Sequence, residues 1–170
     1  MQEAAQQEYV EYVTARMAAL RRLAFLLCGD EHRGDDLVQQ TITRLYERWL
    51  RIRSVEHLDQ YVRTMLVRAF LDERRSVWSR VRLFGALPDQ RATNETSVED
   101  REVLRAALAR VPRRQQAVLV LRFLCDLPVA EVAEILGCTA GTVKSQTSHG
   151  LAALRRELGE QALAGLQRGI

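Results

Sequence analysis

The sequence is poor in the residues that cross-link small secreted domains or hold metal ions. Its 170 residues include three cysteines, an odd number, with no C-x-x-C pair and no nearby histidine at ligand spacing. We therefore expect no disulfide framework, metal site or cofactor. Cys28, Cys125 and Cys138 lie within or beside apolar segments, which favours buried free thiols in a reducing cytoplasm.

Long apolar runs and catalytic motifs are also missing. No segment approaches the length of a membrane-spanning helix and no signal peptide opens the chain, so we expect a cytoplasmic protein without membrane insertion. There is no Gly-rich phosphate loop and no Ser/His/Asp spacing. His32, His57 and His149 are scattered and are most simply surface residues. We expect no catalytic residues and no enzyme activity.

What is present is helical periodicity and a mild positive charge. The formal net charge is +3 and the sequence pI is about 9.0, which suggests an anionic partner without deciding it. No strand alternation, internal repeat or low-complexity segment interrupts the pattern. The sequence therefore predicts an all-α protein made of two small helical domains.

The stretch from Leu127 to Leu158 carries the clearest motif. Pro128 suits a helix start, and Gly137 can adopt the left-handed conformation that ends that helix. Thr139 can cap a second helix, whose Val143 would pack inward. This spacing predicts a helix-turn-helix, whose second helix reads base edges in the DNA major groove. The same pattern also fits two helices that are merely packed in a bundle.

The first lobe contains three predicted helices. The first covers 6–27 and ends at Gly29-Asp30, and the second is entered at Gly34 with Asp35 and Asp36. The second leaves a mixed-charge polar face, which the pattern alone favours as solvated surface. The third begins near Glu56 and continues, with a kink, into a cluster of arginines and aromatic residues. This mixture suits nucleic-acid binding, but its aromatic residues could equally close the hydrophobic core. The cluster consists of Arg74, Arg75, Trp78, Arg80, Arg82 and Phe84.

A polar segment with Pro88 separates the two lobes. Residues 86–96 are expected to form a flexible linker, and a capping box at Ser97–Asp100 is expected to start the second lobe. Pro112 is predicted to open the helix that precedes the helix-turn-helix.

The order of these features resembles an extracytoplasmic-function (ECF) sigma factor, a short sigma-70-type protein with regions 2 and 4 only. Three stretches carry the resemblance over about 9–158: G-D-D-L-V-Q-Q-T from Gly34 resembles region 2.2, L-D-Q-Y-V-R-T-M-L-V-R from Leu58 resembles region 2.3, and G-T-V-K-S from Gly141 resembles region 4.2. Within the family the chain is most similar to a SigE-like actinobacterial subfamily. The resemblance implies region 2 at 1–85, the linker at 86–96, region 4 at 97–160 and a tail at 161–170. No further C-terminal domain is expected.

The resemblance also implies partners and sites. Region 2 would dock on the clamp helices of the RNA polymerase β′ subunit through Asp36, Gln39, Gln40, Arg44 and Arg48. It would bind the promoter −10 element, and hold a base flipped from the nontemplate strand, through Val67, Arg68, Phe70, Arg74, Arg75, Trp78 and Arg80. Region 4 would contact the β flap and place Lys144, Ser145, Gln146, Ser148 and His149 in the −35 major groove. Arg113 and Arg114 would hold phosphates, and an anti-sigma factor is a possible further partner.

Four positions depart from the family pattern. Many relatives carry Asn where Arg68 stands, so the −10 specificity cannot be carried over. Gln146 and His149 replace common arginines and make the −35 surface less positive. Gln favours adenine, which suggests that Gln146 reads a base. Gln40 replaces an acidic residue, a change not expected to abolish docking.

Two other binding functions fit the pattern less well. A freestanding helix-turn-helix regulator would use the second lobe on DNA without polymerase, and its first lobe would sense a ligand or dimerise. A protein-interaction adaptor would never bind DNA, and the arginine cluster weighs against it. Duplex binding in the absence of polymerase would distinguish the regulator from a sigma factor.

Overall fold

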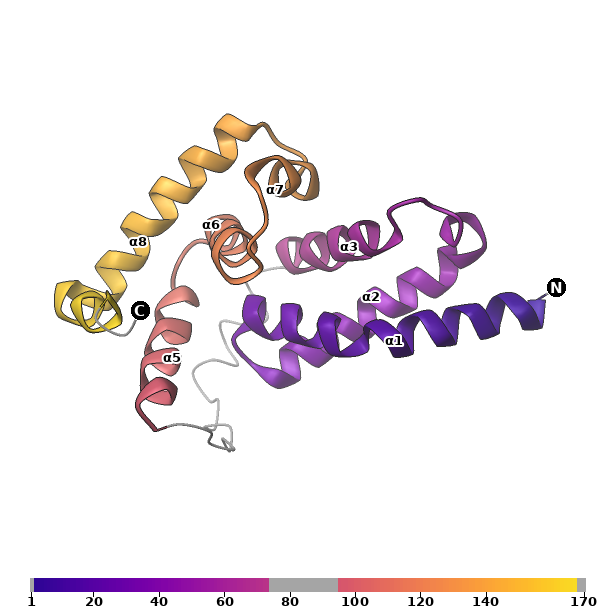
Figure 1. Cartoon of the computed structure of the whole chain (residues 1–170), viewed down its shortest axis with the longest axis horizontal. Helices are drawn as coiled ribbons and strands as arrows, with labels where there is room; N and C mark the ends of the chain where they lie inside the picture. Colours follow the sequence, from indigo (N-terminus) through magenta and orange to yellow (C-terminus); the bar gives the residue numbers. More distant parts are fainter. Residues whose placement is uncertain (1, 74–94, 168–170) are drawn as a thin grey trace.

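The computed structural model describes residues 2–73 and 95–167, and it describes the side chains of 95–97 and 160–167 no further than their helical backbone. Within those ranges the chain forms helices and no strand, which confirms the all-α prediction (Figure 1). No helix in the described part of the chain is long and apolar enough to cross a membrane. The elements are α1 (Gln2–Cys28), α2 (Glu31–Ile52), α3 (Leu58–Asp72), α5 (Glu95–Leu108), α6 (Arg113–Leu119), the π-helix η1 (Val120–Leu124), α7 (Val129–Leu136) and α8 (Ala140–Gln167).

The first lobe is built on α1 and α2, which run antiparallel side by side with α3 packed against them (Figure 1). Their apolar stripes meet in a core in which Leu27, Leu45 and Leu66 are fully buried, as helical periodicity requires. The helix start expected at Gly34 is wrong by one turn. Asp30 caps α2 instead, because its Oδ1 accepts a hydrogen bond from the Arg33 backbone N at 2.9 Å.

Gly34 therefore lies inside α2, and it has a packing role there. A Cβ at this position would lie 3.3 Å from the backbone N of Phe25 and 3.4 Å from the carbonyl C of Ala24. Both atoms belong to the α1 backbone, which cannot rotate away as a side chain can. The missing side chain lets the two helices approach closely.

The second lobe confirms the helix-turn-helix. Pro128 caps α7, and Gly137 ends it at φ +63°, in the left-handed region. The Thr139 Oγ1 accepts a hydrogen bond from the Thr142 backbone N at 3.1 Å, and Val143 is fully buried. Pro112 caps α6 as expected. The capping box expected at Ser97 is wrong, because α5 is already helical from Glu95.

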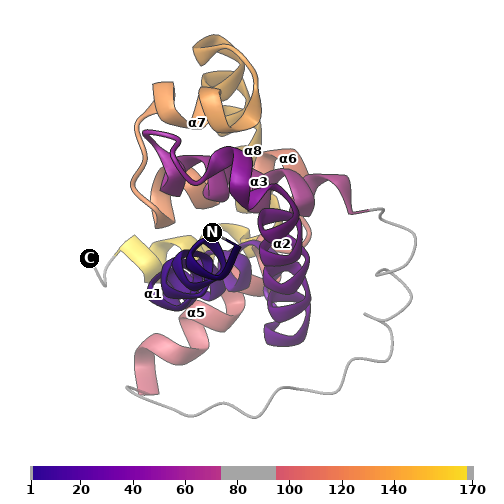
Figure 2. The same cartoon turned by 90° about the vertical axis from the view of Figure 1, so that its right-hand side faces the viewer.

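The two lobes pack against each other, which the sequence did not indicate. One buried cluster contains Leu27 and Leu66 of the first lobe together with Val118, Leu121 and Val143 of the second. Figures 1 and 2 both place α3 beside α6 and α7. The cysteines are free: Cys28 is buried and the other two are partly buried. Burial raises the pKa of the Cys28 thiol to about 11.

Candidate nucleic-acid interface

The first turns of α8 present a short polar surface. Because Val143 points into the core, Lys144, Ser145, Ser148 and His149 are exposed and Gln146 is half-buried. The Ser145 hydroxyl donates to the Thr142 backbone O at 3.0 Å. Side chains of this kind at the start of a recognition helix can meet base edges.

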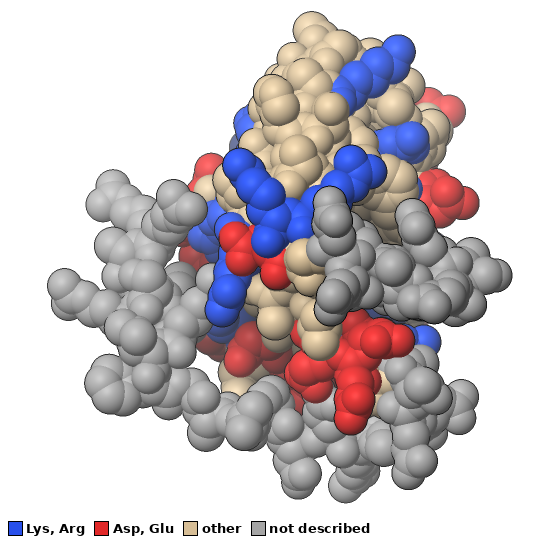
Figure 3. Space-filling view, turned by 90° about the vertical axis from the view of Figure 1, so that its left-hand side faces the viewer, with Lys and Arg blue, Asp and Glu red and all other residues tan. Residues whose placement is uncertain are grey.

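The upper part of the molecule in Figure 3, where α8 begins, is mostly uncharged. Lys and Arg side chains are scattered over it, and Asp and Glu side chains gather lower down on the same view. A mostly uncharged surface that binds DNA depends more on polar contacts and less on attraction to phosphates.

Gly150 lets α8 lie close to α6. A Cβ on Gly150 would lie 3.1 Å from Leu119 Cγ and 3.3 Å from Gln115 Cβ. At Gly141 the nearest atom would be the Thr139 Oγ1 at 3.7 Å, an ordinary contact. Close approach therefore explains Gly150 and does not explain Gly141.

The two arginines expected to hold phosphates lie at the start of α6 and differ in their surroundings. Arg114 is exposed, and its Nη2 donates to the Leu136 backbone O at 3.3 Å, at the end of α7. The Arg113 side chain is 19% exposed and forms an ion pair with Glu73, with 2.7 Å between Nη2 and Oε2. Its guanidinium also lies over the Phe70 ring, 4.5 Å from the ring centre.

Of the residues expected to bind the −10 element, the structure describes Val67, Arg68 and Phe70, and it does not bring these three together on a surface. Val67 is fully buried and Phe70 is 1% exposed, both in the cluster shared by the two lobes. Arg68 is exposed, beside the turn of the helix-turn-helix, and its Nη2 would lie 3.6 Å from a Cβ on Gly137. Arg74, Arg75, Trp78 and Arg80, like Arg82 and Phe84 of the cluster and most of the expected linker, lie outside the described residues.

The outer face of α2 carries the residues expected to dock on polymerase. All five are exposed, whereas Leu37, Val38, Leu45 and Trp49 on the opposite face are buried. No ion pair with another described residue involves Asp36, Arg44 or Arg48. The five residues expected to dock on polymerase are Asp36, Gln39, Gln40, Arg44 and Arg48.

Two large apolar side chains on the same face were missed by the sequence analysis. Leu50 is 67% exposed and Tyr46 is 53% exposed. The Tyr46 ring packs edge-on against Tyr9, with 5.0 Å between ring centres. The signal was present in the helical spacing, because residues 39, 43, 46 and 50 fall on one stripe.

Comparison with known proteins places both lobes in one family. The family model described as "Sigma-70, region 4" matches residues 101–154, and the "Sigma2 domain of PhyR" matches residues 13–58. The chain is 35% identical to an RNA polymerase sigma-E factor of Streptomyces avermitilis over 157 residues, which covers 89% of this chain and 85% of that protein. It is 31% identical to the ECF RNA polymerase sigma factor SigL of Mycobacterium tuberculosis, with 84% of each chain covered.

A solved structure shows the same fold. The sigma factor RpoE of Bartonella quintana, solved in complex with the anti-sigma factor NepR, superposes with a TM-score of 0.66 at 22% identity, covering 89% of this chain and 97% of that one. These similarities confirm the resemblance given by the three motifs and do not favour the freestanding regulator. The chain belongs to the extracytoplasmic-function sigma factors of RNA polymerase.

Proposed function

We propose that this sigma factor docks on core RNA polymerase through the outer face of α2 and reads the −35 element with the start of α8. Two surfaces in one chain carry the proposal. The helix-turn-helix is formed and exposes a polar surface at the start of α8. The outer face of α2 is also exposed, and its charged residues form no ion pair with the described residues. A sigma factor catalyses nothing itself; it directs promoter-specific initiation by the polymerase. We infer that the protein works in the cytoplasm, where it would meet polymerase and promoter DNA.

The docking site would be the β′ clamp helices, and region 4 would contact the β flap. In region 2 the contacts come from Asp36, Gln39, Gln40, Arg44 and Arg48, which project from one helix face. Tyr46 and Leu50 would extend this face with apolar area. Apolar anchors within a polar rim are the usual composition of a protein interface.

The promoter would be bound at two places. Lys144, Ser145, Gln146, Ser148 and His149 would read the −35 major groove, with Arg113 and Arg114 on phosphates to fix the register. The −10 element would be bound by Val67, Arg68, Phe70, Arg74, Arg75, Trp78 and Arg80. Because Val67 and Phe70 are buried between the lobes, binding of a flipped base requires the lobes to move apart.

The domain division follows from the same proposal. Region 2 would cover 1–85 and region 4 would cover 97–160, joined by the linker 86–96 and followed by a tail at 161–170. An anti-sigma factor would be a further partner. The solved complex of RpoE with NepR supports this, since this chain shares its fold.

The test is transcription in vitro from a pool of genomic promoter fragments, with core polymerase and with or without the protein. We expect specific start sites that depend on the protein, and their alignment would give both promoter elements. A sizing column checks co-elution with core. Absence of both transcripts and co-elution would contradict the proposal, and tight duplex binding without polymerase would then support a freestanding regulator.

A further inference from the structure

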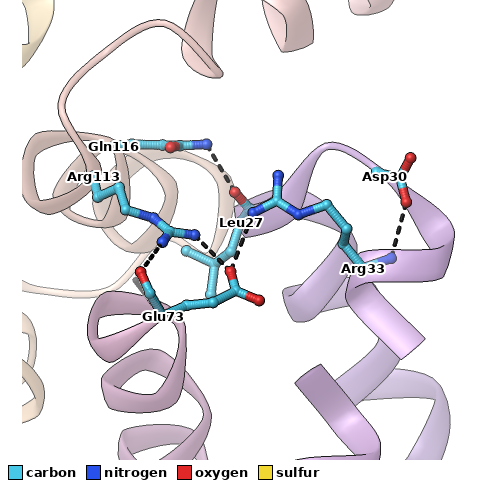
Figure 4. A network of polar contacts seen from close by, with 6 residues as sticks. All are labelled: Leu27, Asp30, Arg33, Glu73, Arg113 and Gln116. Carbon is cyan, nitrogen blue, oxygen red and sulfur yellow. Dashed lines mark hydrogen bonds and ion pairs between the residues drawn. The ribbon is translucent and has the colours of Figure 1, made fainter. Parts of the chain in front are cut away.

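Three charged side chains meet where the two lobes join (Figure 4). Glu73 follows the end of α3, Arg33 lies on α2 and Arg113 begins α6. The Glu73 Oε2 lies 2.7 Å from Arg113 Nη2 and 3.1 Å from Arg33 Nη2. Arg113 Nη1 also donates to the Glu73 backbone O at 2.5 Å. We call this cluster the Glu73 junction.

The junction is withdrawn from water. The side chains are 11%, 12% and 19% exposed for Arg33, Glu73 and Arg113 respectively. A carboxylate held by guanidinium groups away from water interacts more strongly than an exposed pair. Breaking such a pair leaves a charge poorly solvated, which costs more than the loss of a surface ion pair.

Other polar contacts between the lobes differ from the Glu73 junction in their exposure or in their charge. Arg63 pairs with Glu131 at 2.6 Å, and Gln60 donates to Glu134 at 2.7 Å, but these side chains are more exposed than the junction. Exposed pairs contribute little to stability. Gln116, one turn after Arg113, donates its Nε2 to the Leu27 backbone O at 2.7 Å and is buried (Figure 4). The start of α6 is therefore the part of region 4 that region 2 holds most firmly.

The junction occupies a side chain that the proposed function assigns to DNA. Arg113 would hold a −35 phosphate, and a carboxylate uses the same guanidinium donors that a phosphate would use. The same arginine covers the Phe70 ring, which is assigned to the −10 element. Neither contact with DNA is compatible with the junction as it stands.

We propose that Glu73 acts as an internal substitute for a DNA phosphate, which closes the two lobes and occupies Arg113 in the free protein. Docking on polymerase and promoter separates the lobes, and the −35 phosphate then replaces the Glu73 carboxylate on Arg113. The closed state lowers the apparent affinity for DNA by the fraction of molecules that remain open. The assignment of Arg113 to a phosphate rests on the proposed function.

The test compares Glu73→Gln with wild type in the full-length protein. Gln keeps the shape of the side chain and removes its charge. The matched control is Glu157→Gln, which makes the same change in net charge but breaks a pair within region 4, Arg110–Glu157 at 3.4 Å. Small-angle X-ray scattering measures the radius of gyration, and fluorescence anisotropy measures affinity for a −35 duplex at several salt concentrations.

We expect Glu73→Gln to increase the radius of gyration and to bind the −35 duplex about tenfold more tightly than wild type. The control should leave the radius unchanged and alter affinity less than about twofold, which separates the junction from a general gain in positive charge. An unchanged radius or an unchanged affinity in Glu73→Gln would overturn the proposal. If that variant loses helical circular dichroism, Glu73→Asp replaces it, with the same direction expected from the shorter reach.

A charge exchange tests the pair itself. Glu73→Arg alone should open the protein, because three arginines would then meet. Adding Arg113→Glu should restore the compact radius, and failure to restore it would count against the pair. Transcription by the wild type with core polymerase tests the proposed function separately. If the wild type directs transcription and Glu73→Gln leaves the radius of gyration unchanged, only the role of the Glu73 junction is contradicted. If Glu73→Gln increases the radius of gyration and the wild type directs no transcription, only the proposed function is contradicted.

Discussion

At the residue scale, the contacts proposed for Gln146 and Lys144 are two different ways of binding DNA. Gln146 is half-buried, which restricts the freedom of its side chain, whereas Lys144 is exposed. A restrained amide can donate and accept at one base, and adenine offers the matching pair of groups. A mobile ammonium group is better suited to a phosphate, which carries no sequence information.

This difference predicts distinct effects of substitution. Gln146→Ala should flatten the preference for one base at a single −35 position, by about 1–3 kcal/mol of discrimination. Lys144→Ala should weaken binding to all sequences alike and reduce the salt slope by about 1. Transcription with core polymerase on templates that vary at each −35 position gives the measurement, and an unchanged base preference in Gln146→Ala would rule out its role as a reader.

At the element scale, the pairing of α1 with α2 depends on one position without a side chain. Gly34 faces the backbone of Phe25 and Ala24. Because Gly34 has no Cβ, the axes of α1 and α2 can lie closer together than a larger residue would allow. Gly141, in the first turn of α8, has only ordinary contacts around it. The two glycines therefore give opposite expectations for the same substitution.

Gly34→Ala should lower the free energy of unfolding by about 1–3 kcal/mol, because α1 must shift to accept the methyl group and overpacking exceeds the gain in helix propensity. Gly141→Ala should raise it by up to about 1 kcal/mol, because the methyl group meets no backbone. Urea unfolding followed by circular dichroism measures both. Equal effects of the two substitutions would contradict this account of the helix contact.

At the scale of the whole molecule, the lobes are joined by a buried polar contact as well as by apolar packing. Gln116 is 4% exposed and donates to the Leu27 carbonyl in the last turn of α1. Carbonyl groups in a final helical turn lack an intrahelical donor, so a side chain from elsewhere must satisfy them when they are buried. Gln116 supplies that donor from the other lobe.

Replacing Gln116 should therefore weaken the contact between lobes. Gln116→Leu keeps the volume and leaves the Leu27 carbonyl without its donor, at a cost of about 1–3 kcal/mol. We expect a larger radius of gyration in small-angle scattering with the helical circular dichroism unchanged. Gln115→Leu, on a partly exposed neighbour, is the control, and an equal effect of both variants would show that the hydrogen bond is not the cause.

The sequence by itself determined the helical class, the helix-turn-helix and the family. Gly137, Thr139 and Val143 act within a few residues of one another, so their spacing carries the conformational information directly. The helix starts near Asp30 and Glu95 were placed wrongly, because several polar residues in a row can cap a helix and only the folded chain selects one. The assignments of single residues to contacts with DNA and polymerase remain predictions.

Only the tertiary structure decided how the lobes meet. Glu73 and Arg113 are 40 residues apart in the chain, and a single ion pair between distant residues leaves no period in the sequence. The close contact at Gly34 depends likewise on which face of a helix finds a partner. Helix propensity, capping and periodicity within a few residues determined where the helices form. Packing between distant parts of the chain determined which of their charged and apolar residues remain exposed to other molecules.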